Sequence, residues 1–140
     1  MIIKIKYMDG MEHILQAHPG EWYDLRAAER RCYRAGEKVE IPLGVAMELP
    51  EGYEAIIKPR SSTFRKRHLI FADSGVIDNV YRGDTDFWSS VWYAIGMGIV
   101  MKNDRIAQFR IQKVQHVIEF KEVEHLEGED RGGFGSTGTN

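Results

Sequence analysis

The sequence predicts an all-β domain of the sandwich, jelly-roll or barrel type, followed by a glycine-rich tail. Short alternating or apolar runs recur along the 140 residues, and turn signals rich in Gly, Pro and Asp separate them. The most helix-prone segment, Leu25–Ala35, has no sustained apolar face. Many short strands joined by tight turns are typical of two packed sheets or a closed barrel.

The predicted elements follow in order from the N-terminus. Ile2–Tyr7 alternates like a strand and ends at Asp9–Gly10, whereas Leu25–Ala35 contains alanines and a glutamate that favour a helical turn or two. Ser61–Arg67 is expected to form a short helix that starts at a serine N-cap. The other strands are expected at Lys38–Ile41, Val45–Leu49, Tyr53–Lys58, Leu69–Phe71, Gly75–Ile77, Phe87–Ala94, Ile106–Ile111 and Val117–Val123.

Length and composition limit the classes of function. We expect residues 1–126 to form one domain and residues 127–140 to form a flexible tail, because acidic residues and then glycines dominate from Glu122 onward. The net charge of -2, with both signs mixed along the chain, offers no surface for direct nucleic-acid binding. The single cysteine, Cys32, excludes an intramolecular disulfide and fits a reducing compartment.

Patterns for other locations and sites are missing. The N-terminus lacks the apolar run of a signal peptide, and the apolar stretch Val91–Val100 is too short to span a bilayer. We therefore expect a cytoplasmic protein, of a bacterium or a phage-infected cell, with no membrane partner. The five histidines show no zinc-site spacing, which argues against a transition metal held by protein ligands.

The last ten residues carry the strongest chemical signal. Arg131–Asn140 contains four glycines and cannot build a core. Glycines let successive backbone N–H groups converge on an anion, and Arg131, Ser136 and Thr137 add side-chain donors for phosphate oxygens. Phe134 offers a flat face for a base. The alternative interpretation is an ordinary frayed chain end.

A strand-to-helix junction supplies a second candidate anion site. Pro59–Ser62 follows an apolar strand and opens the predicted helix, so its backbone N–H groups are expected to point outward. Arg60 and Ser61 are suited to holding phosphate there. The alternative is a capped helix start with a solvated arginine.

Two further segments carry polar groups next to strands. Gly75–Asp84 is expected to form a β-hairpin, in which Asp78 is either a turn residue or a carboxylate that deprotonates a water beside a phosphate. Tyr81 would support a sugar or base ring. Asn103–Gln108 places a turn before a strand, with Asp104 and Arg105 available for a local ion pair and Gln108 for an oriented hydrogen bond.

These segments, together with Asp24–Leu25, occur in the order and approximate spacing of the five motifs of the homotrimeric dUTPases. The chain resembles that family along nearly its whole length, most specifically in Gly75–Asp84 and in the Gly-Gly-Phe-Gly-Ser-Thr-Gly tail. Met47–Tyr53, Asp86–Trp88 and Glu129–Phe134 are most similar to the bacteriophage and prophage branch.

The resemblance implies a distorted jelly roll of the β-clip type, assembled as a homotrimer with active sites at subunit boundaries and with each tail closing over a neighbour's site. It implies hydrolysis of dUTP to dUMP and pyrophosphate by attack of water on the α-phosphorus, which limits uracil incorporation into DNA. The implied cofactor is Mg²⁺, held through the substrate phosphates and water rather than by protein ligands.

Carried over by position, the resemblance makes Asp78 the general base and places Gln108 at the attacking water or the phosphates. Asp24 would support the metal's waters or a neighbouring arginine. Tyr81 matches the ring under the deoxyribose, and the hairpin backbone, including Gly75 and Ile77, would read uracil. The other matched positions bind the phosphates or, for Phe134, stack on the uracil: Arg60, Ser61, Ser62, Arg131, Phe134, Gly135, Ser136 and Thr137.

The chain departs from the family pattern at several positions. Glu21–Trp22 stand where Ala-Gly is common, Val80 replaces a second acid in the hairpin, and Ser62 replaces a glycine. The spacing between Arg131 and Phe134 is short. None of these departures removes Asp78, Tyr81 or Phe134.

Two alternatives stay open at this point. A dCTP deaminase shares the implied fold, but that enzyme uses a glutamate as its catalytic acid–base and lacks the glycine-rich tail. A phage-type regulatory protein would keep the nucleotide pocket and bind a protein partner. The aromatic-rich segment Trp88–Val100 would then be a contact surface, and otherwise core or trimer packing.

Overall fold

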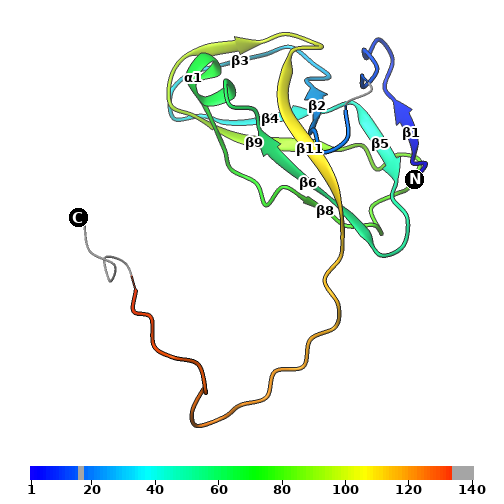
Figure 1. Ribbon diagram of the computed structural model, residues 1–140. Helices are drawn as coiled ribbons and strands as arrows, with labels where there is room; N and C mark the ends of the chain where they lie inside the picture. The colour runs from blue at the N-terminus through cyan, green and yellow to red at the C-terminus, as the bar shows by residue number, and fades with distance from the viewer. Residues whose placement is uncertain (16–17, 134–140) are drawn as a thin grey trace.

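The computed structural model describes residues 1–15 and 18–133, and short strands dominate it (Figure 1). The single helix of the described chain has five residues. The elements are β1 (Lys4–Tyr7), β2 (Tyr23–Arg26), β3 (Arg31–Tyr33), β4 (Lys38–Pro42), β5 (Val45–Glu48), β6 (Tyr53–Pro59), α1 (Thr63–Arg67), β7 (Leu69–Phe71), β8 (Val76–Ile77), β9 (Ser89–Ala94), β10 (Gly98–Val100) and β11 (Arg105–Lys113).

The strands form two main sheets and two ribbons. One sheet has the order β2-β11-β6-β8, and the other has the order β4-β9-β7. β1 pairs with β5 and β3 pairs with β10 as two-stranded ribbons, and every pairing is antiparallel. In Figure 1, β11 runs between β2 and β6 along the length of the domain. This jelly-roll-like arrangement confirms the predicted all-β fold.

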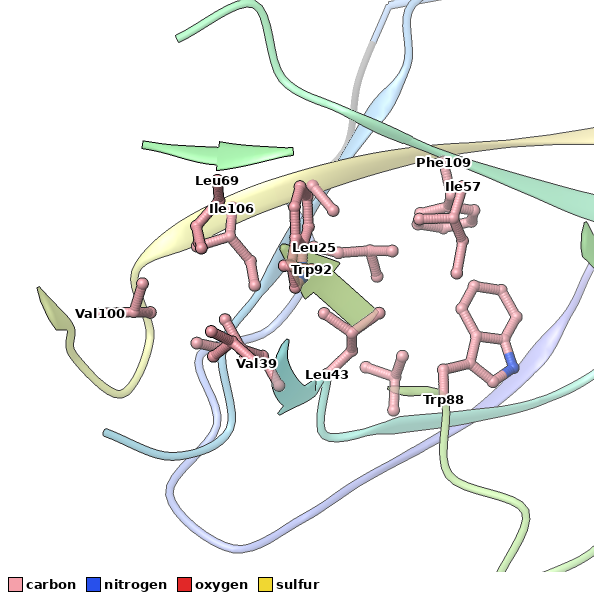
Figure 2. Packing of buried hydrophobic residues seen from close by; sticks show 14 of the residues in the cluster. Leu25, Val39, Leu43, Ile57, Leu69, Trp88, Trp92, Val100, Ile106 and Phe109 are labelled. Atoms are coloured by element: carbon pink, nitrogen blue, oxygen red, sulfur yellow. The ribbon is translucent and has the colours of Figure 1, made fainter. Parts of the chain in front are cut away.

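One apolar core lies between the sheets (Figure 2). Ile57 and Phe109 come from the four-stranded sheet, Ile41 and Trp92 come from the three-stranded sheet, and all four are at most 4% exposed. Trp88, just before β9, is fully buried and meets Phe109 edge-on with ring centroids 5.4 Å apart. Burial of these large side chains supplies the main driving force that holds the sheets together.

Most predicted elements agree with the structure to within a few residues. The strands expected at Lys38–Ile41, Tyr53–Lys58, Leu69–Phe71 and Ile106–Ile111 correspond to β4, β6, β7 and β11. The predicted short helix is α1, which starts at Ser62 as N-cap, but no side-chain hydrogen bond caps it.

The helical turn predicted within Leu25–Ala35 is wrong. The segment contains the end of β2, a buried turn and β3. Ala27 exchanges backbone hydrogen bonds with the distant loop before β11, donating to Asp104 and accepting from Asn103, both at 2.8 Å. These pairings and the burial of Ala27 and Ala28 against the core outweigh the weak helix preference of alanine.

The hairpin predicted over Gly75–Asp84 is also wrong in its second arm. β8 pairs with β6, and residues 81–84 form bends and turns without a strand. A turn does follow β8, because the N–H of Tyr81 donates to the carbonyl of Asp78 at 3.1 Å. Gly83 and Asp86 close the next turn, which competes with strand pairing.

The strand predicted at Val117–Val123 is absent as well. After Lys113 the described chain has no helix or strand, and residues 114–133 are all exposed (Figure 1). A strand needs a neighbour for its N–H and C=O groups, and nothing in the described chain pairs with this segment. The division into residues 1–126 and 127–140 stays a prediction.

A buried hydrogen-bonded serine gives a stability test of this fold. The hydroxyl of Ser90 donates to the carbonyl of Ile41 at 2.8 Å and accepts from the indole N–H of Trp92 at 2.7 Å. Ser90→Ala strands the buried indole, so we expect the free energy of unfolding to fall by about 1–3 kcal/mol. The exposed neighbour provides the control, because Ser89→Ala should change it by less than about 0.5 kcal/mol. Urea denaturation measures both, and equal losses would contradict the role of Ser90.

Candidate functional site

A polar row crosses the outer face of the four-stranded sheet. Gln108 on β11 lies opposite Asp24 on β2 and opposite Lys58 on β6. Directly paired residues share a face, and adjacent strands lie about 4.8 Å apart. Their chain neighbours turn inward, since Leu25, Ile57 and Phe109 are at most 4% exposed. The row therefore faces away from the core.

Asp24 links this row to Arg60, which follows β6. Its Oδ1 lies 2.8 Å from Nε of Arg60, and its Oδ2 accepts a hydrogen bond from Arg105 at 3.2 Å. The side-chain amide of Gln108 donates to the carbonyl of Pro59 at 3.0 Å. The structure thus brings three predicted site residues, Asp24, Arg60 and Gln108, into one group.

Thr63 fixes the turn that carries Arg60, Ser61 and Ser62. It is 2% exposed, donates to the carbonyl of Ile106 at 2.7 Å, and accepts from the backbone N–H of Arg60 at 3.2 Å. Ser62 makes no capping hydrogen bond and Ser61 is exposed, which leaves both hydroxyls available to a ligand. The sequence analysis missed Thr63, although a hydroxyl residue at the buried start of an apolar helix signals an anchored turn.

A cationic cleft of about 300 Å³ adjoins this group. Its lining includes five basic side chains: Arg26, Arg60, Lys66, Arg67 and Arg105. The local ion pair expected between Asp104 and Arg105 is wrong, because Asp104 pairs with Arg67 at 3.0 Å and Arg105 with Asp24 at 3.2 Å. The β-strand geometry sends the two consecutive side chains in different directions. The cleft is suited to an anion.

The largest cavity among the described residues lies elsewhere. Its volume is about 640 Å³, and it is lined mainly by β1, β2 and β11, including Ile3, Ile5, Tyr23 and Ile111. None of the predicted site residues lines it. Because its walls lack convergent polar groups, we assign the chemistry to the smaller polar group.

Gly75 begins a second group of predicted site residues on the far side of β6. It adopts a φ of 73°, and its carbonyl accepts from the N–H of Ile57 at 2.6 Å. A Cβ at this position would collide with the carbonyl oxygen of Ile57. Only glycine fits, because both the left-handed backbone and the close approach exclude a side chain. Ile77 then pairs with Ala55 and packs against the core.

Asp78 and Tyr81 lie at the turn that follows β8. Asp78 is exposed, and among the described residues no hydrogen bond or ion pair engages its carboxylate. The hydroxyl of Tyr81 donates to the carbonyl of Phe87 at 3.1 Å, which fixes the ring. Lys6 braces the same loop by binding the carboxylate of Asp84 at 2.9 Å. The turn therefore presents a free carboxylate beside a held aromatic ring.

The two groups do not meet within one chain. Ile77 pairs with Ala55, whereas Gln108 pairs with Lys58, three residues further along β6 and on its other side. At about 3.3 Å per residue and about 4.8 Å per strand, their backbones are about 14 Å apart. The chain continues from Ile77 away from Lys58, so one water cannot contact both Asp78 and Gln108.

The tail residues add little geometry. Arg131 is exposed and outside any helix or strand. Phe134, Gly135, Ser136 and Thr137 lie outside the described residues. Among residues 1–15 and 18–133, no three His, Cys, Asp or Glu side chains gather as a metal site requires. Within the same residues, no helix has the length and apolar character needed to cross a membrane.

Sequence comparisons identify relatives along almost the entire chain. The family model described as dUTPase matches residues 18–138. The SPbeta prophage-derived deoxyuridine 5'-triphosphate nucleotidohydrolase YosS of Bacillus subtilis is 50% identical over 141 residues and covers 99% of each chain. The deoxyuridine 5'-triphosphate nucleotidohydrolase of Leifsonia xyli is 39% identical over 133 residues, with 87% of this chain and 82% of the relative covered.

Solved structures of phage proteins share the fold. The dUTPase of Staphylococcus bacteriophage 80alpha with dUpNHpp superposes with a TM-score of 0.77 at 26% identity over 99% of both chains. The dUTPase of the S. aureus phage phi11, which coordinates a structural Mg(II) ion, superposes with a TM-score of 0.74 at 21% identity, covering 91% of this chain and all of the other. The family model and the full-length prophage relative agree with the sequence motifs: this chain belongs to the dUTPase family.

Proposed function

We propose that this dUTPase-family enzyme hydrolyses dUTP to dUMP and pyrophosphate by attack of water on the α-phosphorus, and that it thereby limits uracil incorporation into DNA. One geometric observation carries the proposal. The chain presents a cationic group around Arg60 and, separately, a free carboxylate at Asp78 beside a held tyrosine ring. Phosphate-ester hydrolysis needs both an anion-binding group and a base for water.

Asp78 is the general base in this proposal. Its exposed carboxylate accepts the proton of the attacking water, and Gln108 from another subunit orients that water or a phosphate oxygen. Tyr81 lies under the deoxyribose, where its ring disfavours a 2′-hydroxyl. The backbone around Gly75 and Ile77 reads the uracil edge, which the close packing of Gly75 on Ile57 supports.

The phosphates bind the group around Arg60. The Nε of Arg60 faces Asp24, and the planar guanidinium offers further N–H donors to an anion. Ser61 and Ser62 add hydroxyls from the turn that Thr63 anchors. The tail completes the site in the proposal: Phe134 stacks on the uracil, and Arg131, Gly135, Ser136 and Thr137 bind the γ end of the triphosphate.

Mg²⁺ fits the residues present as an ion that the substrate brings. The described chain offers no cluster of three carboxylates, histidines or cysteines, and Mg²⁺ commonly keeps waters and binds through substrate phosphates. When bound, it would neutralise phosphate charge. Asp24 is the carboxylate placed to accept hydrogen bonds from its waters.

The proposed assembly is a homotrimer with sites at subunit boundaries. Two observations support it: Asp78 and Gln108 lie too far apart within one chain, and residues 114–126 expose apolar side chains outside the domain. Phe120 is 90% exposed and Leu126 is 87% exposed. Exposed apolar groups on this scale mark a surface that another chain covers.

A regulatory role remains a second candidate. The 80alpha phage dUTPases are described as controlling transfer of virulence genes by a proto-oncogenic G protein-like mechanism. Near β9 and β10 this chain exposes Tyr93, Ile95 and Met97, of which Met97 is 77% exposed. Such a surface is suited to a protein partner and is compatible with catalysis by the same chain.

Replacing the proposed base tests the reaction. Asp78→Asn should lower pyrophosphate release from dUTP by about 10²- to 10⁴-fold while leaving nucleotide affinity nearly unchanged, because only proton transfer is lost. Asp73→Asn, an exposed aspartate earlier in the same connection, is the matched control and should retain activity. Unchanged turnover in Asp78→Asn would exclude it as the base. Ammonia release from dCTP would instead favour the deaminase alternative.

Removing the tail tests its role at the site. A chain that ends at Asp130 should lose activity, since Arg131 and the glycine-rich segment no longer reach the phosphates. Its oligomeric state and thermal unfolding midpoint should change little, because residues 114–133 are exposed and make few contacts with the domain. Size-exclusion chromatography with light scattering and a melting curve measure both. A truncated chain that fails to fold would contradict a lid.

Mixing two inactive variants tests whether sites are shared. Asp78→Asn subunits and subunits truncated after Asp130 should together regain part of the activity, because some sites then combine an intact base with an intact tail. Mass spectrometry of intact assemblies confirms mixing. No recovery in demonstrated mixed assemblies would mean that each chain completes its own site.

A further inference from the structure

The carboxylate of Asp24 is divided between two arginines. Oδ1 lies 2.8 Å from Nε of Arg60, and Oδ2 accepts from a terminal nitrogen of Arg105 at 3.2 Å. Each arginine thus holds one oxygen, and neither takes the two-oxygen, fork-to-fork geometry that arginine and carboxylate favour. The side chains are partly exposed, at 33% for Asp24, 27% for Arg60 and 49% for Arg105.

A bulge in β11 places Arg105 next to Asp24. Gln108 pairs with Asp24 and Ala107 with Leu25, but Arg105 rather than Ile106 lies opposite Arg26. The additional residue is Ile106, which turns into the core beside Ala107, both 0% exposed. In a regular ladder Ile106 would occupy the outer face and Arg105 would point inward. The bulge reverses this and puts Arg105 on the face that carries Asp24 and Gln108.

The division of the carboxylate decides what Arg60 can bind. If Oδ2 were released, rotation of Asp24 would let both oxygens engage Arg60, including a terminal nitrogen of its guanidinium. That nitrogen would then be lost to an anion. Arg105 holds Oδ2 away, so the contact with Arg60 stays at Nε and the outer edge of the guanidinium remains open toward the cleft.

We propose that Arg105 is a positioning residue that acts through Asp24 to keep Arg60 open for the substrate phosphates. The inference rests on the proposed function, because it assigns Arg60 to phosphate binding. Its contribution to stability is small, since partly exposed ion pairs add little to folding. Its effect should therefore appear in substrate binding.

The primary test compares arginine variants on the same strand. Arg105→Gln should raise the KM for dUTP and the Kd for dUpNHpp about 10-fold, the loss of roughly one charge-assisted hydrogen bond, while kcat stays within about threefold. Arg105→Lys keeps a donor for Asp24 and should recover part of the affinity. Arg110→Gln is the control, because Arg110 donates to the carbonyl of Gly20 at 2.8 Å on β11 and should leave KM unchanged.

A double-mutant cycle separates positioning from direct binding. In an Asp24→Asn background, Arg105→Gln should change the Kd for dUpNHpp by less than about twofold, because the carboxylate that it controls is gone. A 10-fold loss in both backgrounds would mean that Arg105 binds the phosphates itself, which overturns the inference. An unchanged Kd in the single variant also overturns it, as does a large fall in the melting midpoint with full affinity.

The proposed function fails separately from this inference. If the wild type binds dUpNHpp but releases no pyrophosphate from dUTP, the hydrolytic assignment is wrong, and the Kd cycle still decides the role of Arg105. If the wild type hydrolyses dUTP and the cycle is additive, only the inference about Arg105 is lost.

Discussion

The pairing of β11 with two neighbours is the constraint on which the rest of the molecule depends. β11 is hydrogen-bonded to β2 on one side and to β6 on the other. Its inward side chains, such as Phe109, pack on Trp88 and join the two sheets. Its outward side chains carry Gln108 and Arg105. Because strand residues alternate between faces, burial of one set fixes the orientation of the other.

Anchoring of the polar group follows from the same strand. Thr63 binds the carbonyl of Ile106 and holds the turn of Arg60, while Gln108 binds the carbonyl of Pro59. The Arg60 group is therefore held on a rigid sheet rather than on a free loop, which favours a preorganised anion site. The partly exposed ion pairs around Asp24 orient donors more than they stabilise the fold.

The single chain presents the two halves of the proposed site on opposite sides of β6. Asp78 and Tyr81 lie beyond β8, and Asp24, Arg60 and Gln108 lie on the β11 side. The exposed apolar residues after β11 point to the same need for another chain. The full-length similarity to a prophage nucleotidohydrolase is consistent with such an assembly, since its sequence is conserved in length as well as in motifs.

The sequence by itself determined the all-β class, most strand positions, the buried alternation of β6 and β11, and the family, because these depend on local periodicity and on motif order. It also predicted that Asp24, Arg60 and Gln108 belong to one site, through the resemblance. Only the tertiary structure decided that Ala27 and Ala28 form a buried turn rather than a helix, that β8 pairs with β6 instead of with its own hairpin arm, and that Arg105 binds Asp24 instead of leaving Asp104 to pair with it. Each of these depends on contacts between residues far apart in the chain, where long-range backbone pairing and burial outweigh local preference.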